Sequence, residues 1–271
     1  MLLEKYRNLQ DILQKMESVV VAFSGGVDST FLLKVAIDTL GYDNVLAITA
    51  DSETYPSSEL KEALMLSKWI GANHRVIQTS ELAIPGYTEN NQNRCYFCKS
   101  SLFDNLLPIL EEYEFNNIIY GVIADDANEF RPGMKAAKEK GIRGPLLEAD
   151  LFKEEIRTLS KEAGLPTWNK PSFACLSSRI AYGDIITKEK LTKVDKSEAY
   201  LKSLDIHQVR VRTHEDTARI EVEPDDMPRV LQYHGAITKR LKQFGYKYVS
   251  MDLTGYTSGS MNMALKKEEM S

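Results

Sequence analysis

Residues 19–33 constrain the fold more than any other part of the sequence. They begin with the apolar residues of a short buried strand, continue through Ser24, Gly25 and Gly26, and enter an apolar-periodic helix that opens at Asp28. Glycine at such a turn lets backbone N–H groups approach an anion closely, and the helix start adds unpaired N–H groups with partial positive charge. The sequence therefore predicts a phosphate-binding turn between the first strand and the helix that follows.

The side chains of this turn narrow the kind of phosphate site. A Walker loop carries a lysine just before the Ser or Thr that follows its glycines, and no lysine is present here. Ser24 and Ser29 can add hydroxyl donors, Val27 fills a variable position, and Asp28 suits a Mg²⁺ ligand or a helix N-cap. The segment resembles the PP-loop, S-G-G-x-D-S, of the ATP pyrophosphatases. That resemblance implies that residues 24–29 bind the pyrophosphate part of ATP; an ordinary strand-to-helix turn is the alternative.

Strands and helices are predicted to alternate through the N-terminal part of the chain. Buried strands are predicted at 19–23 and 45–50, and further strands at 74–77 and 117–121. Helices are predicted at 2–17, from 28 onward, at 57–70 and at 95–113. This alternation indicates an α/β fold with a doubly wound parallel sheet. Because ligands of such sheets bind beyond the carboxyl ends of the strands, we expect Ser24, Asp51, Ser52 and Gly121 to share one ATP pocket.

The pattern changes after about residue 185. A long helix is predicted at 187–203, strands at 207–212 and 218–223, a helix at about 226–243 and a last strand at 248–253. These elements suit a small α/β module with a sheet of its own. We therefore predict a PP-loop domain at 1–185 and a smaller domain for substrate binding and oligomerisation at 186–271.

Composition and charge favour a soluble globular protein without bulk affinity for nucleic acid. The net charge of −5 is opposite in sign to that of most nucleic-acid-binding proteins. The sequence holds no apolar run of about eighteen residues, so we expect no membrane span. The first residues lack a basic region followed by an apolar one, so no signal peptide is expected. An odd number of cysteines that includes C-x-x-C is typical of the reducing cytoplasm.

Charged residues follow the fourth predicted strand. Adjacent acids at a phosphate site, here Asp125 and Asp126, suit Mg²⁺ coordination, whereas on a solvated loop they would carry no function. Arg131 comes next and can neutralise phosphate or the charge that develops during displacement. A surface position for Arg131 is the alternative.

The three cysteines form a second informative group. Cys95 and Cys98 are three residues apart, so they share a helix face or one turn, and Cys175 lies in a polar loop. A structural zinc site needs four protein ligands, whereas three thiolates suit a [4Fe–4S] cluster with one open iron. A thioredoxin-like redox pair, a lone nucleophilic Cys175 and three buried structural cysteines are the alternatives.

The second predicted domain carries a pair of arginines on one strand. Arg210 and Arg212 are two residues apart and therefore lie on the same face, which suits a substrate phosphate, and Glu198 can face them from the long helix. A solvent-facing strand is the alternative. The hydroxyl- and glycine-rich segment 254–260 suits another phosphate or simply the end of the fold.

Taken together, these motifs resemble the LarE family of ATP-dependent sulfur transferases, which build the nickel-pincer nucleotide cofactor of lactate racemase. The resemblance spans nearly the whole chain and rests on segments 24–29, 124–126, 131–133, 143–148, 170–171, 175–179, 210–212 and 255–262. It implies that ATP adenylates the carboxylates of pyridinium-3,5-biscarboxylic acid mononucleotide, and that sulfur then replaces AMP. It also implies that Ser178, Glu198, Arg210 and Arg212 bind this substrate, and that Cys175 presents the sulfur.

One departure concerns the source of sulfur. The single-cysteine branch of the family gives up its own cysteine sulfur at the position of Cys175, whereas this chain adds Cys95 and Cys98. It resembles the branch that holds a [4Fe–4S] cluster on three cysteines with an exchangeable sulfide, which we favour. The resemblance further implies a homohexamer and delivery to a nickel-inserting partner. Within PP-loop chemistry the alternative is tRNA 2-thiolation, which the acidic composition disfavours; a non-catalytic nucleotide-binding regulator is a third possibility.

Overall fold

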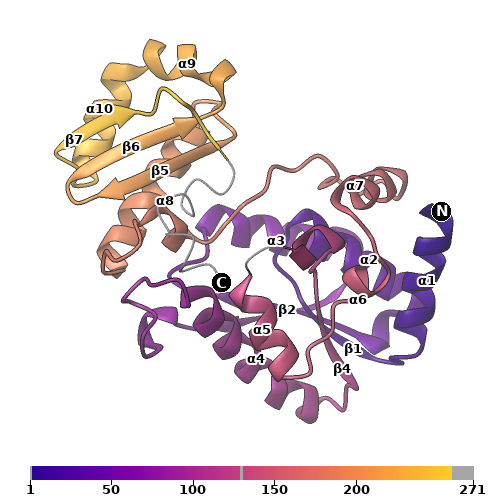
Figure 1. Cartoon of the computed structure of the whole chain (residues 1–271). Coiled ribbons are helices and arrows are strands. Elements are labelled where there is room, and N and C mark those ends of the chain that lie inside the picture. Colours follow the sequence, from indigo (N-terminus) through magenta and orange to yellow (C-terminus); the bar gives the residue numbers. More distant parts are fainter. Residues whose placement is uncertain (1, 129–130, 258–271) are drawn as a thin grey trace. The chain divides into compact units, whose positions relative to one another are not determined.

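The computed structural model of the chain describes residues 2–128 and 131–257, and it divides into two compact units (Figure 1). The first unit consists of Met1–Thr79 and Cys95–Phe173, and the second of Ser80–Arg94 and Ala174–Ser271. The chain therefore leaves the first unit after Thr79 and returns to it at Cys95. Part of the predicted C-terminal motif, residues 258–262, lies outside the described residues.

A parallel sheet forms the centre of the first unit. Its strands are β1 (Val19–Ala22), β2 (Val45–Asp51), β3 (Asn73–Gln78) and β4 (Asn117–Tyr120). Neighbouring strands are all parallel, in the order β3-β2-β1-β4. The order reverses at β1, because β2 and β3 lie on one side of it and β4 on the other. Such a reversal places a ligand site beyond the carboxyl ends of β1 and β4, and the predicted phosphate-binding turn begins at the end of β1. The predicted α/β fold with a parallel sheet is confirmed.

Helices cover both faces of this sheet, and alternate residues of β1 show which helices belong to which face. Val19 and Val21 pack with residues of α1, α2 and α7, whereas Val20 packs with Phe103 of α4 and Ala137 of α5. The helices of the unit are α1 (Leu2–Gln14), α2 (Val27–Leu40), α3 (Ser57–Ile70), α4 (Arg94–Glu112), α5 (Pro132–Glu139), α6 (Pro145–Glu148) and α7 (Lys153–Glu162). Figure 1 shows these helices around the sheet.

Local sequence determines where α3 ends, whereas three other helices were not predicted. The helix α3 spans the predicted range and ends at Gly71, whose φ of 74° is the left-handed conformation that glycine adopts readily. The helices α5, α6 and α7 were not predicted, although Ile156 and Leu159 of α7 have helical spacing and pack into the core. None of the helices in the described ranges is long and apolar enough to cross a membrane.

The second unit has a three-stranded sheet with its own core. Its main elements are α8 (Lys188–Lys202), β5 (Val209–His214), β6 (Thr217–Val222), α9 (Met227–Gln232), α10 (His234–Gln243) and β7 (Tyr248–Met251). Strands β5 and β6 pair antiparallel, and β6 pairs parallel with β7. Val209, Val211 and Ile220 of the sheet pack with Leu201 of α8 and Leu241 of α10. The helix predicted at about 226–243 is two helices, α9 and α10, separated at Tyr233.

The division between the units differs from the predicted boundary at residue 185. Residues 80–94 belong to the second unit because their side chains bond to the segment after Ala174: the Tyr87 hydroxyl lies 2.7 Å from that of Ser177, and the Asn90 amide donates to the Ile180 and Ala181 carbonyls. The Arg94 guanidinium donates to the Ser177 carbonyl at 3.1 Å. These buried polar bonds fix a polar loop that carries no helical or strand periodicity.

Candidate active site

The phosphate-binding turn has the backbone that an anion site needs. Gly25 has a φ of 65°, and a Cβ at this position would lie 3.1 Å from the Cβ of Ala63 in α3. The Ser24 N–H donates to the Ser29 hydroxyl at 3.2 Å, and the two hydroxyls are 3.0 Å apart. The first-turn N–H groups of α2 have no acceptors within their own helix. The turn therefore combines a close-packed glycine with a helix start, as the sequence predicts.

The chain after β4 reaches the same turn. A Cβ on Gly121 would lie 2.9 Å from the backbone nitrogen of Ser29. Only glycine permits this approach without a shift of the backbone. The structure thus brings the residues after β1 and β4 together at the point where the strand order reverses.

Asp28 lies beside a lysine that sequence reasoning missed. The ammonium of Lys153 is 2.7 and 2.6 Å from the two carboxylate oxygens of Asp28, and the Lys153 N–H donates to Asp125 at 2.8 Å. Lys153 is the first residue of α7, and 125 positions separate it from Asp28. Two of the predicted metal-binding carboxylates thus bond to the same residue, Asp28 to the ammonium of Lys153 and Asp125 to its backbone N–H.

Asp126 and Arg131 pair with each other. An Nη of Arg131 is 2.7 Å from Asp126, whose other oxygen accepts from the Ile123 N–H at 3.1 Å. Asp126 is buried, and its bond to Ile123 closes the turn after β4. Burial, helped by the negative charge of Asp126, raises the pKa of Tyr120 to about 12. Of the two predicted metal ligands in this loop, Asp125 is the exposed one.

Asp51 and Ser52 lie at the end of β2, as predicted for an ATP pocket. Asp51 accepts from the Gln78 amide at 2.8 Å, and the Ser52 hydroxyl is 3.3 Å from that of Thr54. In the turn that follows, the Tyr55 hydroxyl donates to the Ser24 carbonyl at 2.7 Å. Burial raises the pKa of Tyr55, so its hydroxyl stays protonated as a donor to the phosphate-binding turn.

The cysteines are divided between the units. Cys95 and Cys98 lie in the first turns of α4, the former exposed and the latter half-buried. Cys175 belongs to the second unit, is half-buried, and precedes the short 3₁₀ helix Leu176–Arg179. Across residues 2–128 and 131–257, no three His, Cys, Asp or Glu side chains assemble into a metal-binding group. The iron–sulfur cluster therefore stays a prediction.

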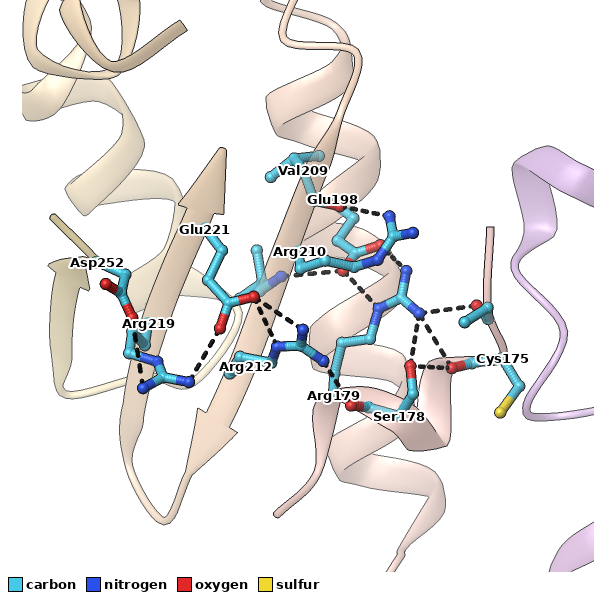
Figure 2. A network of polar contacts seen from close by, with 12 residues as sticks. Cys175, Ser178, Arg179, Glu198, Val209, Arg210, Arg212, Arg219, Glu221 and Asp252 are labelled. Atoms are coloured by element: carbon cyan, nitrogen blue, oxygen red, sulfur yellow. Dashed lines mark hydrogen bonds and ion pairs between the residues drawn. The ribbon is translucent and has the colours of Figure 1, made fainter. Parts of the chain in front are cut away.

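A buried polar network surrounds Arg179 in the second unit (Figure 2). Its guanidinium donates to both oxygens of Glu198 at 2.8 and 2.9 Å, and to the Ala174 and Cys175 carbonyls at 2.7 and 3.1 Å. Burial alone would lower the pKa of Arg179, but the Glu198 carboxylate outweighs it and holds that pKa above the ordinary value. Arg179 thus fixes the backbone that carries Cys175.

Arg212 forms the second part of this network. Its Nε and Nη2 donate to one oxygen of Glu221 at 3.0 and 2.8 Å, and its Nη1 donates to the Ser178 carbonyl at 2.7 Å. The other oxygen of Glu221 accepts from Arg219 at 2.9 Å. Glu221 is 2% exposed, so it holds Arg212 within the protein.

Arg210 is the electrostatically strained member of the network. It is 6% exposed, and its guanidinium lies 5.2 Å from the centre of the Tyr256 ring. Burial, and next the positive charge of Arg179, lower the pKa of Arg210. The predicted face shared by Arg210 and Arg212 is present, but both side chains are buried, and Glu198 bonds to Arg179, a partner that the sequence did not predict. One Nη of Arg210 donates to the Val209 carbonyl at 2.9 Å, and the negative charge of Glu198 partly opposes the lowering of the Arg210 pKa.

Relatives of the chain cover almost its whole length. A pyridinium-3,5-bisthiocarboxylic acid mononucleotide synthase of Lactiplantibacillus plantarum is 38% identical over 266 residues, which make up 98% of this chain and 96% of that enzyme. The chain belongs to the family of this synthase. An uncharacterized protein of Synechocystis sp. is 45% identical over 269 residues, 98% of this chain and the full length of that protein. The family model for NAD synthase matches residues 3–97, which include the phosphate-binding turn.

Membership in the synthase family confirms two predictions. The chain is an enzyme of the PP-loop group, and its class is ATP-dependent sulfur transfer. The structure adds contacts that sequence reasoning did not assign: Lys153 on Asp28, Lys170 at the phosphate-binding turn, and Arg179 at the backbone of Cys175. Lys170 and Arg179 stand in segments on which the family resemblance rested, but the Gly25 partner of Lys170 is 145 positions away. No sequence pattern pointed to Lys153.

Proposed function

We propose that this enzyme uses ATP to activate the carboxylates of pyridinium-3,5-biscarboxylic acid mononucleotide as acyl adenylates, and that sulfur then replaces AMP to give thiocarboxylates. The observation that carries the proposal is the relative named as a bisthiocarboxylic acid mononucleotide synthase, which covers both units of this chain. This relative also favours a small nucleotide over tRNA as the acceptor.

In the first half-reaction the phosphate-binding turn receives the outer two phosphates of ATP. The N–H groups around Gly25 and Gly26 bind pyrophosphate, and the Ser24 and Ser29 hydroxyls complete the donors. A carboxylate oxygen of the acceptor attacks the α-phosphorus, the bond to the bridging oxygen breaks, and pyrophosphate leaves. Asp51 and Ser52 at the end of β2, and Arg131 beyond β4, border the remainder of the nucleotide.

Asp28 and Asp125 are the residues that would hold Mg²⁺. Asp28 already faces the Lys153 ammonium and Asp125 the Lys153 backbone N–H, and carboxylate oxygens are the donors that a hard metal ion prefers. When bound, Mg²⁺ neutralises the charge of the phosphates. Lys153 holds Asp28 in place and can turn toward the phosphates when Asp28 binds another cation.

In the second unit the arginines receive the phosphate of the acceptor nucleotide. Within the buried network Arg179 and Arg212 bond to carboxylates, while burial and the positive charge of Arg179 disfavour the cation of Arg210 despite the attraction of Glu198. A phosphate dianion would add a further counter-charge beside Arg210 and Arg212. Ser178 adds a hydroxyl at the same place, and Glu198 keeps Arg179 fixed.

For the sulfur we propose a [4Fe–4S] cluster on Cys95, Cys98 and Cys175. The donor set fits, because three thiolates favour such a cluster, and Cys95 and Cys98 lie in adjacent positions of one helical turn. When bound, the cluster supplies an exchangeable sulfide. In the second route the sulfur of Cys175 attacks the adenylate, AMP leaves, and loss of the Cys175 α-proton then breaks the Cβ–S bond to leave dehydroalanine.

A single experiment tests the reaction. The purified protein is incubated anaerobically with Mg·ATP, the biscarboxylic acid mononucleotide and sulfide, and both nucleotides are followed by mass spectrometry. We expect AMP, pyrophosphate and a product in which sulfur has replaced a carboxylate oxygen. Release of inorganic phosphate and ADP instead would overturn the proposal.

Analysis of the same protein separates the two sulfur routes. A cluster predicts about four irons per chain in the anaerobic protein, and loss of that iron in a Cys95→Ser variant. Conversion of Cys175 to dehydroalanine after turnover would instead support sacrifice of its sulfur. An iron-free protein that turns over repeatedly with intact Cys175 would contradict both routes.

A further inference from the structure

Side chains hold two consecutive carbonyls of the phosphate-binding turn. The Tyr55 hydroxyl donates to the Ser24 carbonyl at 2.7 Å, and the Lys170 ammonium donates to the Gly25 carbonyl at 3.1 Å. The ring of Phe173 lies against the next residue, since a Cβ on Gly26 would be 3.4 Å from the Phe173 Cε1 atom. The turn is therefore fixed on its carbonyl side by residues that sequence reasoning did not assign.

Lys170 is itself fixed on all sides. Its ammonium lies 2.7 Å from Glu59 and 2.9 Å from Glu62, both of α3, and the side chains of Lys170 and Glu59 are only 11% and 6% exposed. The Lys170 carbonyl accepts from Arg157 of α7 at 3.0 Å. Both the backbone and the side chain of Lys170 are thus held before any ligand arrives.

The direction of a peptide explains what this contact does. No peptide bond in the described residues is cis, and in a trans peptide the C=O and N–H point in opposite directions. A lysine that holds the Gly25 carbonyl therefore directs the N–H of the same peptide, that of Gly26, away from the lysine. In the same way Tyr55 holds the Ser24 carbonyl and directs the Gly25 N–H away from the tyrosine. These are the N–H groups that the proposed function assigns to pyrophosphate.

Stability alone is a poor reason for such an arrangement. A buried lysine with two carboxylates contributes little to folding, because desolvation offsets the attraction between the charges. A hydrogen bond from an ammonium polarises the peptide that accepts it, so the N–H on the other side of the peptide becomes a stronger donor. The contact therefore strengthens an anion site as well as orienting it.

We propose that Lys170 is a positioning residue of the ATP site: through the Gly25 carbonyl it orients and strengthens the N–H donor that binds the pyrophosphate part of the nucleotide, while Glu59 and Glu62 hold its ammonium in place. Lys170 does not touch the nucleotide. The inference rests on the proposed function only in taking Mg·ATP as the ligand.

The test compares ligands that do and do not occupy the phosphate-binding turn. Calorimetry of the full chain without acceptor gives the Kd values of Mg·ATP, Mg·pyrophosphate and AMP for wild type and for Lys170→Met, Lys170→Arg and Lys138→Met. Lys138 is an exposed lysine of α5 and serves as the matched control. The Lys170→Met/Glu59→Gln double variant keeps the test valid if Lys170→Met fails to fold, because it leaves no unpaired charge on Glu59.

For Lys170→Met and for the double variant we expect Mg·ATP and Mg·pyrophosphate to bind about tenfold more weakly or worse, with AMP unchanged. Lys170→Arg should recover part of the loss, and Lys138→Met should match wild type. A structural role would weaken all three ligands alike. Folded variants with wild-type pyrophosphate affinity would overturn the inference, whereas a wild-type protein that does not bind Mg·ATP would overturn the proposed function.

Discussion

The phosphate sites that we propose in the two units are of two different kinds. In the first unit the donors are backbone N–H groups of the contiguous residues 24–29, and the charged side chains around them, Lys153 and Lys170, contact the loop rather than project from it. In the second unit the donors are arginine side chains from separate segments, held by buried carboxylates. A backbone site depends on local conformation, whereas the arginine site depends on tertiary packing that places like charges side by side.

This difference predicts different consequences of mutation. A backbone site keeps its shape when side chains change, and it fails when glycine conformation or the partners of its carbonyls are altered. An arginine site stores electrostatic strain in the empty state, and that strain is relieved when an anion binds. Substitutions in the first unit should therefore affect ATP, and those in the second unit should affect the acceptor.

The largest effect is expected at Asp28. Asp28→Asn removes the charge that faces Lys153 and that would bind Mg²⁺, so pyrophosphate release should fall about a hundred- to a thousandfold. The measurement is pyrophosphate release under saturating acceptor. Asp38→Asn is the control, because Asp38 pairs with Lys34 on the exposed side of the same helix. Undiminished release in Asp28→Asn would mean that the turn is not the pyrophosphate site.

Arg210 should separate acceptor binding from stability. Arg210→Met removes a buried cation that lies beside both Arg179 and Glu198, so we expect the KM of the acceptor to rise about ten- to a hundredfold while the KM of ATP is maintained. The free energy of unfolding should change little, because burial and the charge of Arg179 oppose the attraction of Glu198. Steady-state kinetics and urea unfolding measure both. Arg229→Met, at an exposed position paired with Asp205, is the control. A loss of ATP affinity in Arg210→Met would erase the contrast between the units.

Gly25 tests whether backbone conformation is what the first site needs. Gly25→Ala introduces strain at a φ of 65° and crowds Ala63, so stability should fall by about 1–2 kcal/mol and Mg·ATP should bind more weakly. Gly71→Ala has the same backbone strain at a φ of 74°, but open space around its Cβ. It should lose similar stability with unchanged ATP affinity. If Gly25→Ala bound Mg·ATP as tightly as Gly71→Ala and wild type, the shape of the turn would not determine ATP affinity.

The smallest effect is a pH dependence of stability from His74. Its ring nitrogens are 2.9 Å from the Ser67 and Thr49 hydroxyls, and burial lowers its pKa from 6.5. The unfolded chain therefore takes up this proton more readily, so the free energy of unfolding should decrease as the pH falls below about 6.5 and through the lower pKa of the folded state.

The variant His74→Asn should lose part of this dependence, and His207→Asn, at an exposed site, should keep it. Urea unfolding at several pH values between 8 and 5 provides the measurement. The Thr49 hydroxyl beside His74 donates to the Phe23 carbonyl, just before the phosphate-binding turn. The pH dependence from His74 is therefore a property of the first unit. An identical slope in wild type and His74→Asn would assign the dependence elsewhere.

Local signals explain which parts of the fold could be predicted. Short local signals determine the first strands, α2 and α3, so these elements could be predicted from the sequence. The signals are the glycines at 25, 26 and 71 and the apolar runs at 19–22 and 45–50. The last helix was predicted as one element because its apolar spacing continues across Tyr233, where the backbone leaves the helical conformation.

The remaining features depend on contacts between distant residues. No sequence pattern near Lys153 predicts that it pairs with Asp28, and none in residues 80–94 predicts that Asn90 bonds to Ile180. The arginine pair on β5 was visible as a pattern of two, but its burial and the role of Arg179 follow from the tertiary structure. The phosphate-binding turn can thus be predicted from local sequence, whereas the arginine network cannot.

The assembly of the second unit from two stretches of chain has a consequence for synthesis on the ribosome. Tyr87 and Asn90 are made long before their partners, since 90 positions separate each of them from Ser177 and Ile180. At about 5–20 residues per second this delay is roughly 5–18 seconds. During that interval Tyr87 and Asn90 cannot yet bond to the later segment, so their polar groups are hydrated. The second unit can close only after the first has emerged, so the order of translation sets the order of folding.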